Sequence, residues 1–422
     1  MRINRFHTVL AASLGVVALA AGAVGASTGG SSWSRISGPS QPGSQLGLAR
    51  TQDGVLHVIW NRGATGTSIF ETRISPAGKS AGTSTVTTGW NGNGGLALIV
   101  MPDKTLRLFA SGTGGINTFT APTAGRTWSL QRGTFWGTAV AEAAGVIGAT
   151  LTKDGQPVTA WSGNAAVGVP PASVPQSGYQ GGMTESHLAT DAASGAVVLE
   201  GETNAGQGGV YVQQILPSRG AHVLLPPIWK DYGDGVSGRI GAPGVFVAYA
   251  DGTAVRLYRY GGSSKTLSTG GYWSATTCAG PEGRLWVAWA DHSGGLFVTR
   301  SNRAASAFEP VQKLRAPSGP GLSFLQCEGS TGPVDLFANN GGFFHTHVLA
   351  QLALSARAAK AKVTISARDA GDPVAGVKIT VAGKHLTTDA HGLVSLTLRP
   401  GSYSASAIAA GYAPASTKVS VR

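Results

Sequence analysis

The chain has 422 residues and a formal net charge of +12; 42% of its residues are hydrophobic, 12% are charged and 63 are glycine. The length accommodates two or three domains, and the apolar share excludes an intrinsically disordered protein. Many glycines and few charges are typical of short strands joined by tight turns, so we expect an all-β protein. Lysine and arginine are dispersed along the chain, which argues against nucleic-acid binding.

The first 26 residues have the pattern of a secretory signal peptide. Arg2 and Arg5 precede an uncharged, Ala- and Gly-rich run over residues 8–26, which closes on a Val-Gly-Ala sequence at 24–26. A positive start, an apolar run and a small-residue cleavage site are the three parts of such a signal. We expect residues 1–26 to be removed, leaving a secreted or cell-surface chain of net charge +10 with no membrane span. An uncleaved anchor is the alternative.

One short pattern occurs seven times in the next 300 residues. Each copy is a turn residue followed by a strand of alternating apolar residues, as in Gly54-Val-Leu-His-Val-Ile-Trp60 and Gly283-Arg-Leu-Trp-Val-Ala-Trp289. The copies begin at Gly54, Lys104, Gly155, Gly195, Gly244, Gly283 and Gly332. Their mean spacing of about 46 residues leaves room for four short strands, the size of one propeller blade. We predict a seven-bladed β-propeller over residues 27–350; a β-solenoid or a row of sandwiches is the alternative.

The two ends of the repeat region predict how the ring closes. The sixth repeat continues into a plausible outer strand over residues 308–319, whereas the seventh has no equivalent after His347. Residues 32–39, near the N-terminus, have a suitable sequence. We therefore expect the N-terminal strand to complete the last blade, which would leave no large open sheet edge.

The two cysteines occupy the same place in neighbouring repeats. Cys278 lies five residues before Gly283, and Cys327 lies five residues before Gly332. Equivalent inner strands of adjacent blades run side by side, and an even cysteine count in an exported protein indicates a disulfide. The spacing predicts a bond between Cys278 and Cys327; two buried free thiols are the alternative.

A different pattern begins after the repeats. Residues 351–362 are rich in Ala, Lys and Arg and predict a linker, and residues 363–422 contain five alternating segments that predict a small β-sandwich. This region contains in series Gly371-Asp-Pro-Val-Ala-Gly-Val-Lys-Ile379, Thr388-Asp-Ala-His-Gly392, Leu398-Arg-Pro-Gly-Ser-Tyr403 and Gly411-Tyr412. The series resembles the carboxypeptidase regulatory-like (transthyretin-like) domain. The resemblance implies a structural or adhesion module of surface proteins, without an active site.

One segment within the repeats resembles a known propeller motif, and residues 301–308 resemble it more faintly. Ala121-Pro-Thr-Ala-Gly-Arg-Thr-Trp128 is similar to the Asp box of sialidase-type propellers, Ser-x-Asp-x-Gly-x-Thr-Trp. Gly125, Thr127 and Trp128 match, whereas Ala121 and Thr123 stand in place of Ser and Asp. The resemblance implies a propeller, in which such boxes are structural. The early Arg-Ile-Pro motif of that family is absent, so we assign no catalytic residue from it.

The residues alone indicate no catalytic, metal or cofactor site. Hydrolysis by paired carboxylates needs two acids about 5 to 10 Å apart. The glutamates of the middle repeats are Glu142, Glu185, Glu200 and Glu202. Glu200 and Glu202 would share one strand face, and a solvated face is the simpler interpretation. His345 and His347 would also share a face, but no third ligand is identifiable, so we expect neither metal nor cofactor.

Aromatic residues, most of them next to a glycine, fall between the repeated strand pairs. They are Trp90, Trp136, Trp229, Tyr232, Tyr272 and Trp273. Exposed at a channel mouth, such rings could stack on sugars or anchor a partner; packing between blades is the alternative. We select Trp136, Trp229 and Tyr232 as candidate binding residues. The favoured function is a monomeric binding or scaffold protein that recognises an extracellular glycan or a surface protein; an exported sialidase-like glycoside hydrolase is the alternative.

Overall fold

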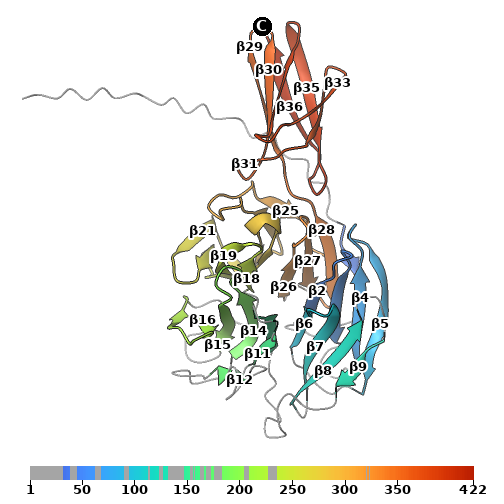
Figure 1. Ribbon diagram of the computed structural model, residues 1–422, viewed down its shortest axis with the longest axis vertical. Helices are drawn as coiled ribbons and strands as arrows, with labels where there is room; N and C mark the ends of the chain where they lie inside the picture. Colours follow the sequence, from blue (N-terminus) through green and yellow to red (C-terminus); the bar gives the residue numbers. More distant parts are fainter. Residues whose placement is uncertain are drawn as a thin grey trace, which may run out of the picture.

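The computed structural model describes most of the chain beyond the first 31 residues. The described residues are 32–38, 45–61, 68–89, 95–112, 115–122, 127–131, 147–152, 155, 157–161, 166–167, 173–174, 183–203, 209–226, 235–319, 321–322 and 324–422. They form antiparallel strands and, at Pro281–Gly283, one short 3-10 helix. Sheets arranged in a ring occupy one end of the molecule, and a two-sheet unit projects from it (Figure 1). The prediction of an all-β protein is confirmed.

Most sheets of the ring are four-stranded meanders, in which each strand pairs with the next along the chain. The first two sheets contain β2 (Gly47–Arg50), β3 (Leu56–Asn61), β4 (Ser68–Ile74) and β5 (Ser80–Thr88), then β6 (Leu96–Val100), β7 (Thr105–Gly112), β8 (Gly115–Pro122) and β9 (Ser129–Gln131). Two pairs follow, β10 (Ile147–Leu151) with β11 (Pro157–Trp161), and β12 (Ala166–Val167) with β13 (Ser173–Val174).

The later sheets of the ring follow the same plan. They contain β14 (Met183–Thr190), β15 (Val197–Thr203), β16 (Gly209–Leu216) and β17 (His222–Leu224), then β18 (Gly235–Arg239), β19 (Ala242–Ala250), β20 (Ala254–Arg259) and β21 (Ser264–Thr269). The next contains β22 (Tyr272–Ala279), β23 (Leu285–Asp291), β24 (Leu296–Arg300) and β25 (Gln312–Leu314). The last contains β26 (Phe324–Glu328), β27 (Val334–Asn339), β28 (Phe343–Val348) and β1 (Ser34–Arg35).

Burial along each meander follows from the strand sequences. The second strands are rich in apolar residues, and every residue of β3 and of β27 is buried. Strands covered on both faces have such runs, because neighbouring sheets pack against each side. The fourth strands carry Ser, Thr and Lys and are largely exposed, as in β5. The polar edge of each meander therefore faces outwards, and the core lies between adjacent sheets.

The first strands of the sheets lie next to one another around the ring. In chain order β2, β6, β10, β14, β18, β22 and β26 each contact the next, and β26 contacts β2. One hydrophobic cluster joins the first and last sheets; it contains Leu46, Val58 and Trp60 together with Phe324 and Phe337. Adjacent four-stranded sheets whose inner strands follow one another in this way make a β-propeller.

Both ends of the ring region contribute to one sheet. β1 pairs antiparallel with β28, with Ser34 opposite His345 and Arg35 opposite Phe344. The Trp33 indole donates a hydrogen bond of 2.6 Å to the backbone oxygen of Arg315, in the preceding sheet. A segment before the first repeat thus lies at the outer edge of the last sheet.

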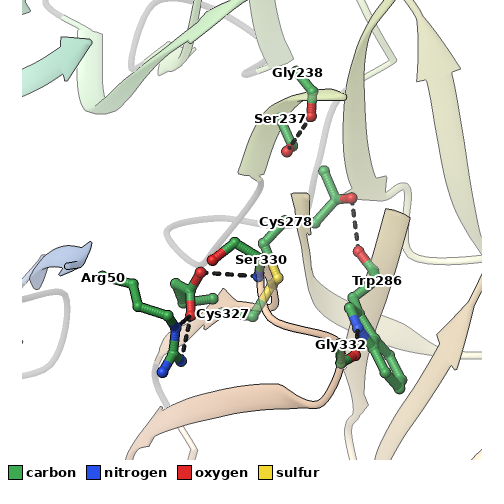
Figure 2. The surroundings of a disulfide bond; sticks show 10 residues. Arg50, Ser237, Gly238, Cys278, Trp286, Cys327, Ser330 and Gly332 are labelled. Carbon is green, nitrogen blue, oxygen red and sulfur yellow. Dashed lines mark hydrogen bonds and ion pairs between the residues drawn. A yellow bond between two sulfur atoms is a disulfide. The ribbon is translucent and has the colours of Figure 1, made fainter. Parts of the chain in front are cut away.

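A disulfide joins Cys278 of β22 to Cys327 of β26, with their Cα atoms 5.7 Å apart. Figure 2 shows the bond between two neighbouring sheets, with Arg50 nearby. Beside it, the Trp286 indole donates a 2.9 Å hydrogen bond to the backbone oxygen of Gly332. The sixth and seventh repeats are therefore linked covalently and by a buried hydrogen bond.

The C-terminal unit is a sandwich of two antiparallel sheets. One contains β29 (Ala353–Ala359), β30 (Lys362–Asp369), β31 (Asp372–Pro373) and β34 (Leu393–Thr397); the other contains β33 (Lys384–Thr387), β32 (Lys378–Val381), β35 (Gly401–Ile408) and β36 (Ala415–Val421). Val363, Ile365, Ile379 and Ala405 lie in its core with almost no exposure. Alternation along each strand buries one face and exposes the other.

The prediction of a linker over residues 351–362 was wrong. Residues Ala353–Ala359 form β29, which pairs along its whole length with β30. Leu354 and Ala356 pack against the sandwich core. These two side chains supply little apolar surface, so the sequence of the segment has only a weak strand pattern. The segment is a strand because it pairs with β30. The sandwich therefore begins at residue 353, directly after the ring.

Candidate binding site at the channel mouth

The C-terminal ends of the inner strands surround a cavity of about 480 Å³. Strands from six successive repeats contribute to it, from β2 through β22. Its lining consists of Ala49, Arg50, Leu98, Ile99, Val100, Thr150, Leu151, Leu188, Ala189, Thr190, Val236, Ser237, Gly238, Arg239, Ile240 and Ala279. A concave site of this size, mostly apolar with a few polar groups, is typical of small-ligand binding.

Hydroxyl groups line one side of the cavity. The Thr190 hydroxyl donates a 2.7 Å hydrogen bond to the backbone oxygen of Leu151 and lies 3.1 Å from the Thr150 hydroxyl. The close approach of β18 to β14 needs Gly238, because a Cβ atom there would overlap the backbone oxygen of Thr190. This wall is thus a fixed surface of aliphatic groups, hydroxyls and backbone.

Arg50 is neutralised by two carboxylates of the last repeat. Its Nε donates a 2.5 Å hydrogen bond to Glu328, and its Nη2 also pairs with Asp335. Burial acts to lower the pKa of Arg50, but the two carboxylates reverse this and hold the pKa above its usual value. Arg50 therefore stays charged and links the first sheet of the ring to the last.

Arg239 lies across the cavity and has a different set of partners. Its guanidinium donates to the backbone oxygens of Gly283 (2.7 Å), Pro243 (2.9 Å) and Arg303. Among the described residues no carboxylate forms an ion pair with it, and its side chain is largely buried. Burial, followed by repulsion from Arg259, lowers its pKa. The cavity wall thus contains a fixed positive charge that suits hydroxyl, carbonyl or anionic groups of a ligand.

Carboxylates elsewhere in the ring are paired with histidines. Asp335 Oδ1 lies 2.8 Å from His345 Nε2 and 2.9 Å from His347 Nδ1, while Glu71 Oε1 lies 2.5 Å from His57 Nδ1. His345 and His347 thus converge on one carboxylate. Within the described parts of the chain, no group of three or more His, Cys, Asp or Glu side chains is arranged to hold a metal ion.

The glutamates considered from the sequence do not form a described acid pair. Glu200 is fully buried on β15, with its carboxylate 3.3 Å from His187 Nδ1. Glu202 follows on the same strand and Glu185 lies on β14. Glu142 lies outside the described residues, so of these four glutamates the structure defines the side-chain surroundings of Glu200 alone.

The three selected aromatic residues, Trp136, Trp229 and Tyr232, lie outside the described residues, as does Trp90. Tyr272 packs edge-on against Trp289 and Phe297, inside a core cluster. The Trp273 indole donates a 2.9 Å hydrogen bond to the backbone oxygen of Asp291. For Tyr272 and Trp273 the alternative interpretation, packing within and between sheets, therefore applies.

Trp128 has a role that the motif comparison did not reveal. Its indole donates a 3.1 Å hydrogen bond to Glu71 Oε2, from the second sheet to the first. Burial would raise the pKa of Glu71, but hydrogen bonds from His57, Trp128 and Arg73 lower it to about 2. The tryptophan of the Asp-box-like segment thus joins two sheets.

A second buried polar cluster lies where the sandwich meets the ring. Asp369 Oδ2 accepts a hydrogen bond from Tyr412 (2.8 Å) and ion pairs from Arg284 (2.9 Å) and Arg300. Glu309 lies beside Arg300, at 3.5 Å. Burial and the adjacent Asp369 raise the pKa of Glu309. All these side chains except Tyr412 are buried, so the cluster joins the two units and is closed to a substrate.

Comparison with known proteins supports the fold. A lectin from Burkholderia pseudomallei superposes with a TM-score of 0.54 at 14% identity, over 78% of this chain and 97% of the lectin. The Pan2 WD40 domain of Neurospora crassa is more distant, with a TM-score of 0.44 at 11% identity over 75% of this chain and 95% of the domain. So is the Aleuria aurantia lectin, described as a six-bladed β-propeller with a novel mode of fucose recognition. It superposes with a TM-score of 0.42 at 11% identity over 74% of this chain and 95% of the lectin. No protein-family model and no curated protein matches the sequence. Among the described residues, no helix is long and apolar enough to cross a membrane.

Proposed function

We propose that this chain is an exported binding protein whose propeller recognises an extracellular or envelope glycan, or a surface protein, at the channel mouth. The observation that carries the proposal is the cavity of about 480 Å³ formed by the inner-strand ends. Its aliphatic floor, hydroxyl groups and Arg239 suit a sugar, which presents apolar ring faces and many hydroxyls. The lectin from Burkholderia pseudomallei shares the fold, so glycans are the first ligands to test.

The ring is proposed to have seven blades. Seven inner strands follow one another, from β2 to β26, and the seventh contacts the first. The sheet that begins with β26 is completed by β1 from the N-terminal side. The pairs β10–β11 and β12–β13 belong to the third repeat, which is the least complete of the seven in the described residues.

Binding is favoured over hydrolysis because carboxylates of the ring are paired with other side chains inside the sheets. An acid and a nucleophile or base must both reach the substrate from opposite sides of the scissile bond. Glu71, Glu200 and Asp335 are each paired with histidine inside a sheet. The cluster around Asp369, which contains arginines and a tyrosine as sialidase chemistry requires, is buried between ring and sandwich.

Export is proposed from residues 1–26 and is consistent with the disulfide. The sandwich is proposed to act as a spacer or adhesion module, in line with its resemblance to carboxypeptidase regulatory-like domains. We further propose that the protein acts as a monomer. Trp136, Trp229 and Tyr232 remain proposed ligand contacts.

The test is a glycan array, followed by titration of the best ligands, with the mature chain of residues 27–422. Ile240→Ser removes an exposed aliphatic side chain from the cavity rim, and Leu224→Ser removes one from the outer strand β17. We expect the first to weaken binding about tenfold and the second to leave it unchanged. Ala279→Trp, which fills the cavity, should abolish binding.

Each result separates the alternatives. Equal affinity of the Ala279→Trp variant and the natural chain would place the binding surface elsewhere and overturn the proposal. Turnover of sialosides or aryl glycosides above a blank would favour the hydrolase. Loss of binding in Trp136→Ala or Trp229→Ala, with thermal stability unchanged, would add these rings to the site.

A further inference from the structure

The sandwich has an uneven charge. Residues 353–422 contain nine Lys and Arg residues, three Asp residues and no Glu. The negative side chains and a group of the positive side chains also lie at opposite ends of the sandwich. This separation, and not the total alone, indicates a binding surface.

The three carboxylates lie at the end of the sandwich that faces the ring. Asp369 is buried against Arg284 and Arg300, and Asp372 accepts hydrogen bonds from Arg284 (3.1 Å) and the backbone of Arg303 (2.7 Å). Asp389 accepts from the backbone of its own turn, which is tied to β30 at Ala367. All three acids are therefore engaged close to the propeller.

The opposite end of the sandwich carries cations. Lys360 forms the turn between β29 and β30, and Lys362 follows it, opposite Ala359. The backbone nitrogen of Leu398 donates a 2.9 Å hydrogen bond to Ala361, which places Arg399 beside this turn. Figure 1 shows the β29–β30 turn at the far end from the ring. We call Arg357, Lys360, Lys362 and Arg399 the distal basic tip.

All four side chains of the distal basic tip are exposed. Within the described residues none of them forms an ion pair, and no Asp or Glu side chain lies at this end. Lys360 also has a left-handed backbone (φ 53°), where glycine would be less strained. Four like charges without an Asp or Glu side chain beside them produce a positive potential that attracts anions.

We propose that the distal basic tip binds an acidic polysaccharide. Hydroxyl groups lie next to the cations on the same sheet face: Thr364 is opposite Arg357 and 3.0 Å from Ser395, and Thr397 is opposite Lys362. A sugar chain with anionic groups matches this mixture of cations and hydroxyls. The proposed site is separate from the channel mouth.

An anionic membrane fits the tip less well. Stable binding at a membrane surface needs apolar side chains to insert as well as charge. Among the described residues, the exposed large hydrophobic ones are Leu130, Leu224, Ile240, Val311 and Ile408. Of these, Ile408 alone lies in the sandwich, at the end of β35 nearer the ring. The described part of the tip therefore offers charge and hydroxyls without an apolar anchor.

The test uses the mature chain and heparin, a sulfated polysaccharide, as the probe. The tip variant combines Lys360→Gly, which also relieves the turn, with Lys362→Gln and Arg399→Gln. The control variant removes the same number of charges from the other sheet, away from the tip, as Lys378→Gln, Lys384→Gln and Lys418→Gln, all of which are exposed. Both variants should keep the thermal stability of the natural chain.

We expect the tip variant to bind heparin at least about tenfold more weakly at about 0.15 M salt, and the control to change less than about twofold. Ile240→Ser at the channel mouth should leave heparin binding intact, which separates this site from the proposed function. Equal weakening of both triple variants would mean that net charge alone is responsible. Tighter binding to phosphatidylglycerol vesicles or to DNA than to heparin, or no heparin binding, would also overturn the proposal.

Discussion

The side-chain amide of Gln326 pairs with both backbone groups of Leu46: it accepts from the Leu46 nitrogen (3.2 Å) and donates to the Leu46 oxygen (3.1 Å). Gln326 lies on β26 and Leu46 immediately precedes β2, so one side chain joins the last inner strand to the first. β26 and β2 belong to different sheets and are not paired by backbone hydrogen bonds. The closure of the ring therefore depends on side-chain contacts: this amide, the ion pairs of Arg50 and the hydrophobic cluster shared by the first and last sheets.

Gln326→Leu should destabilise the protein by about 2 kcal/mol, because it leaves two backbone groups at a partly buried site without partners. Urea unfolding followed by fluorescence would measure this. Gln214→Leu is the control, since the Gln214 amide bonds to Ser218 within a single sheet. An equal effect of both substitutions would contradict a special role of the closure contact.

Removal of the disulfide should have a larger effect. Cys278 and Cys327 are separated by 49 residues, and a loop of this length predicts about 4 kcal/mol from the restricted unfolded chain. Cys278→Ala combined with Cys327→Ala should therefore lower the melting temperature markedly. The natural chain should resist thiol labels until it is unfolded and reduced. Labelling of the folded, unreduced protein would show that the bond is absent.

Stability should fall in acid because of Glu71. Its pKa is held at about 2 when folded, below the ordinary value of a glutamate, so its stabilising contribution is complete at neutral pH and decreases as the pH falls from about 4.5 towards 2. Glu71→Gln should lower stability at pH 7 and reduce its dependence on pH below 5. Urea midpoints at pH 7 and pH 3 test both statements. If the urea midpoints of the natural chain and of the variant fall by the same amount between pH 7 and pH 3, Glu71 is not a cause of the loss of stability in acid.

Glu309 should act in the opposite direction. Burial and the adjacent Asp369 raise its pKa, so the folded chain retains a proton that the unfolded chain releases. Its contribution is therefore most favourable in acid and is lost as the pH rises above the ordinary range of a glutamate. Glu309→Gln, which mimics the protonated form, should reduce the loss of stability between pH 5 and pH 8. The midpoints of thermal unfolding at these two pH values provide the measurement.

Asp369→Ala should separate the sandwich from the ring. It leaves Arg284 and Arg300 buried without their shared carboxylate, at a cost of about 3 kcal/mol. We expect calorimetry to show two resolved unfolding transitions. Asp372→Ala is the control, because Asp372 is partly exposed and its loss should cost less than about 1 kcal/mol. A single unchanged transition in the Asp369 variant would show that the cluster does not couple the two units.

The period of the repeat was enough to locate the second strand of each repeat in the ring. The copies that start at Gly283 and Gly332 lead directly into β23 and β27, because a turn residue followed by an apolar run has few other structures open to it. β29 was missed for the opposite reason. Its inward positions are Leu354 and Ala356, and such a weak apolar pattern gains its structure from pairing with β30.

The candidate site was much harder to predict. The cavity is built from single strand ends that lie far apart in the sequence, such as Arg50 and Arg239, and no local pattern marks them. The two histidines of β28 share a face as expected, but their meeting with Asp335 depends on the register between β27 and β28. The sequence could not separate aromatic residues that are exposed from those that pack in the core, because both kinds occur in the segments between the repeated strand pairs.

The pairing of β1 with β28 has a consequence for how the molecule is made. Residues 34–35 leave the ribosome early, yet their partners at 344–345 follow some three hundred residues later. Until then the earliest segment has no sheet to join, and the last sheet lacks its outer strand. Contacts between such distant residues form slowly, because a long stretch of chain must be ordered first. The ring can therefore be completed only after nearly all of it has been synthesised, and a shortened chain would remain open at its seam.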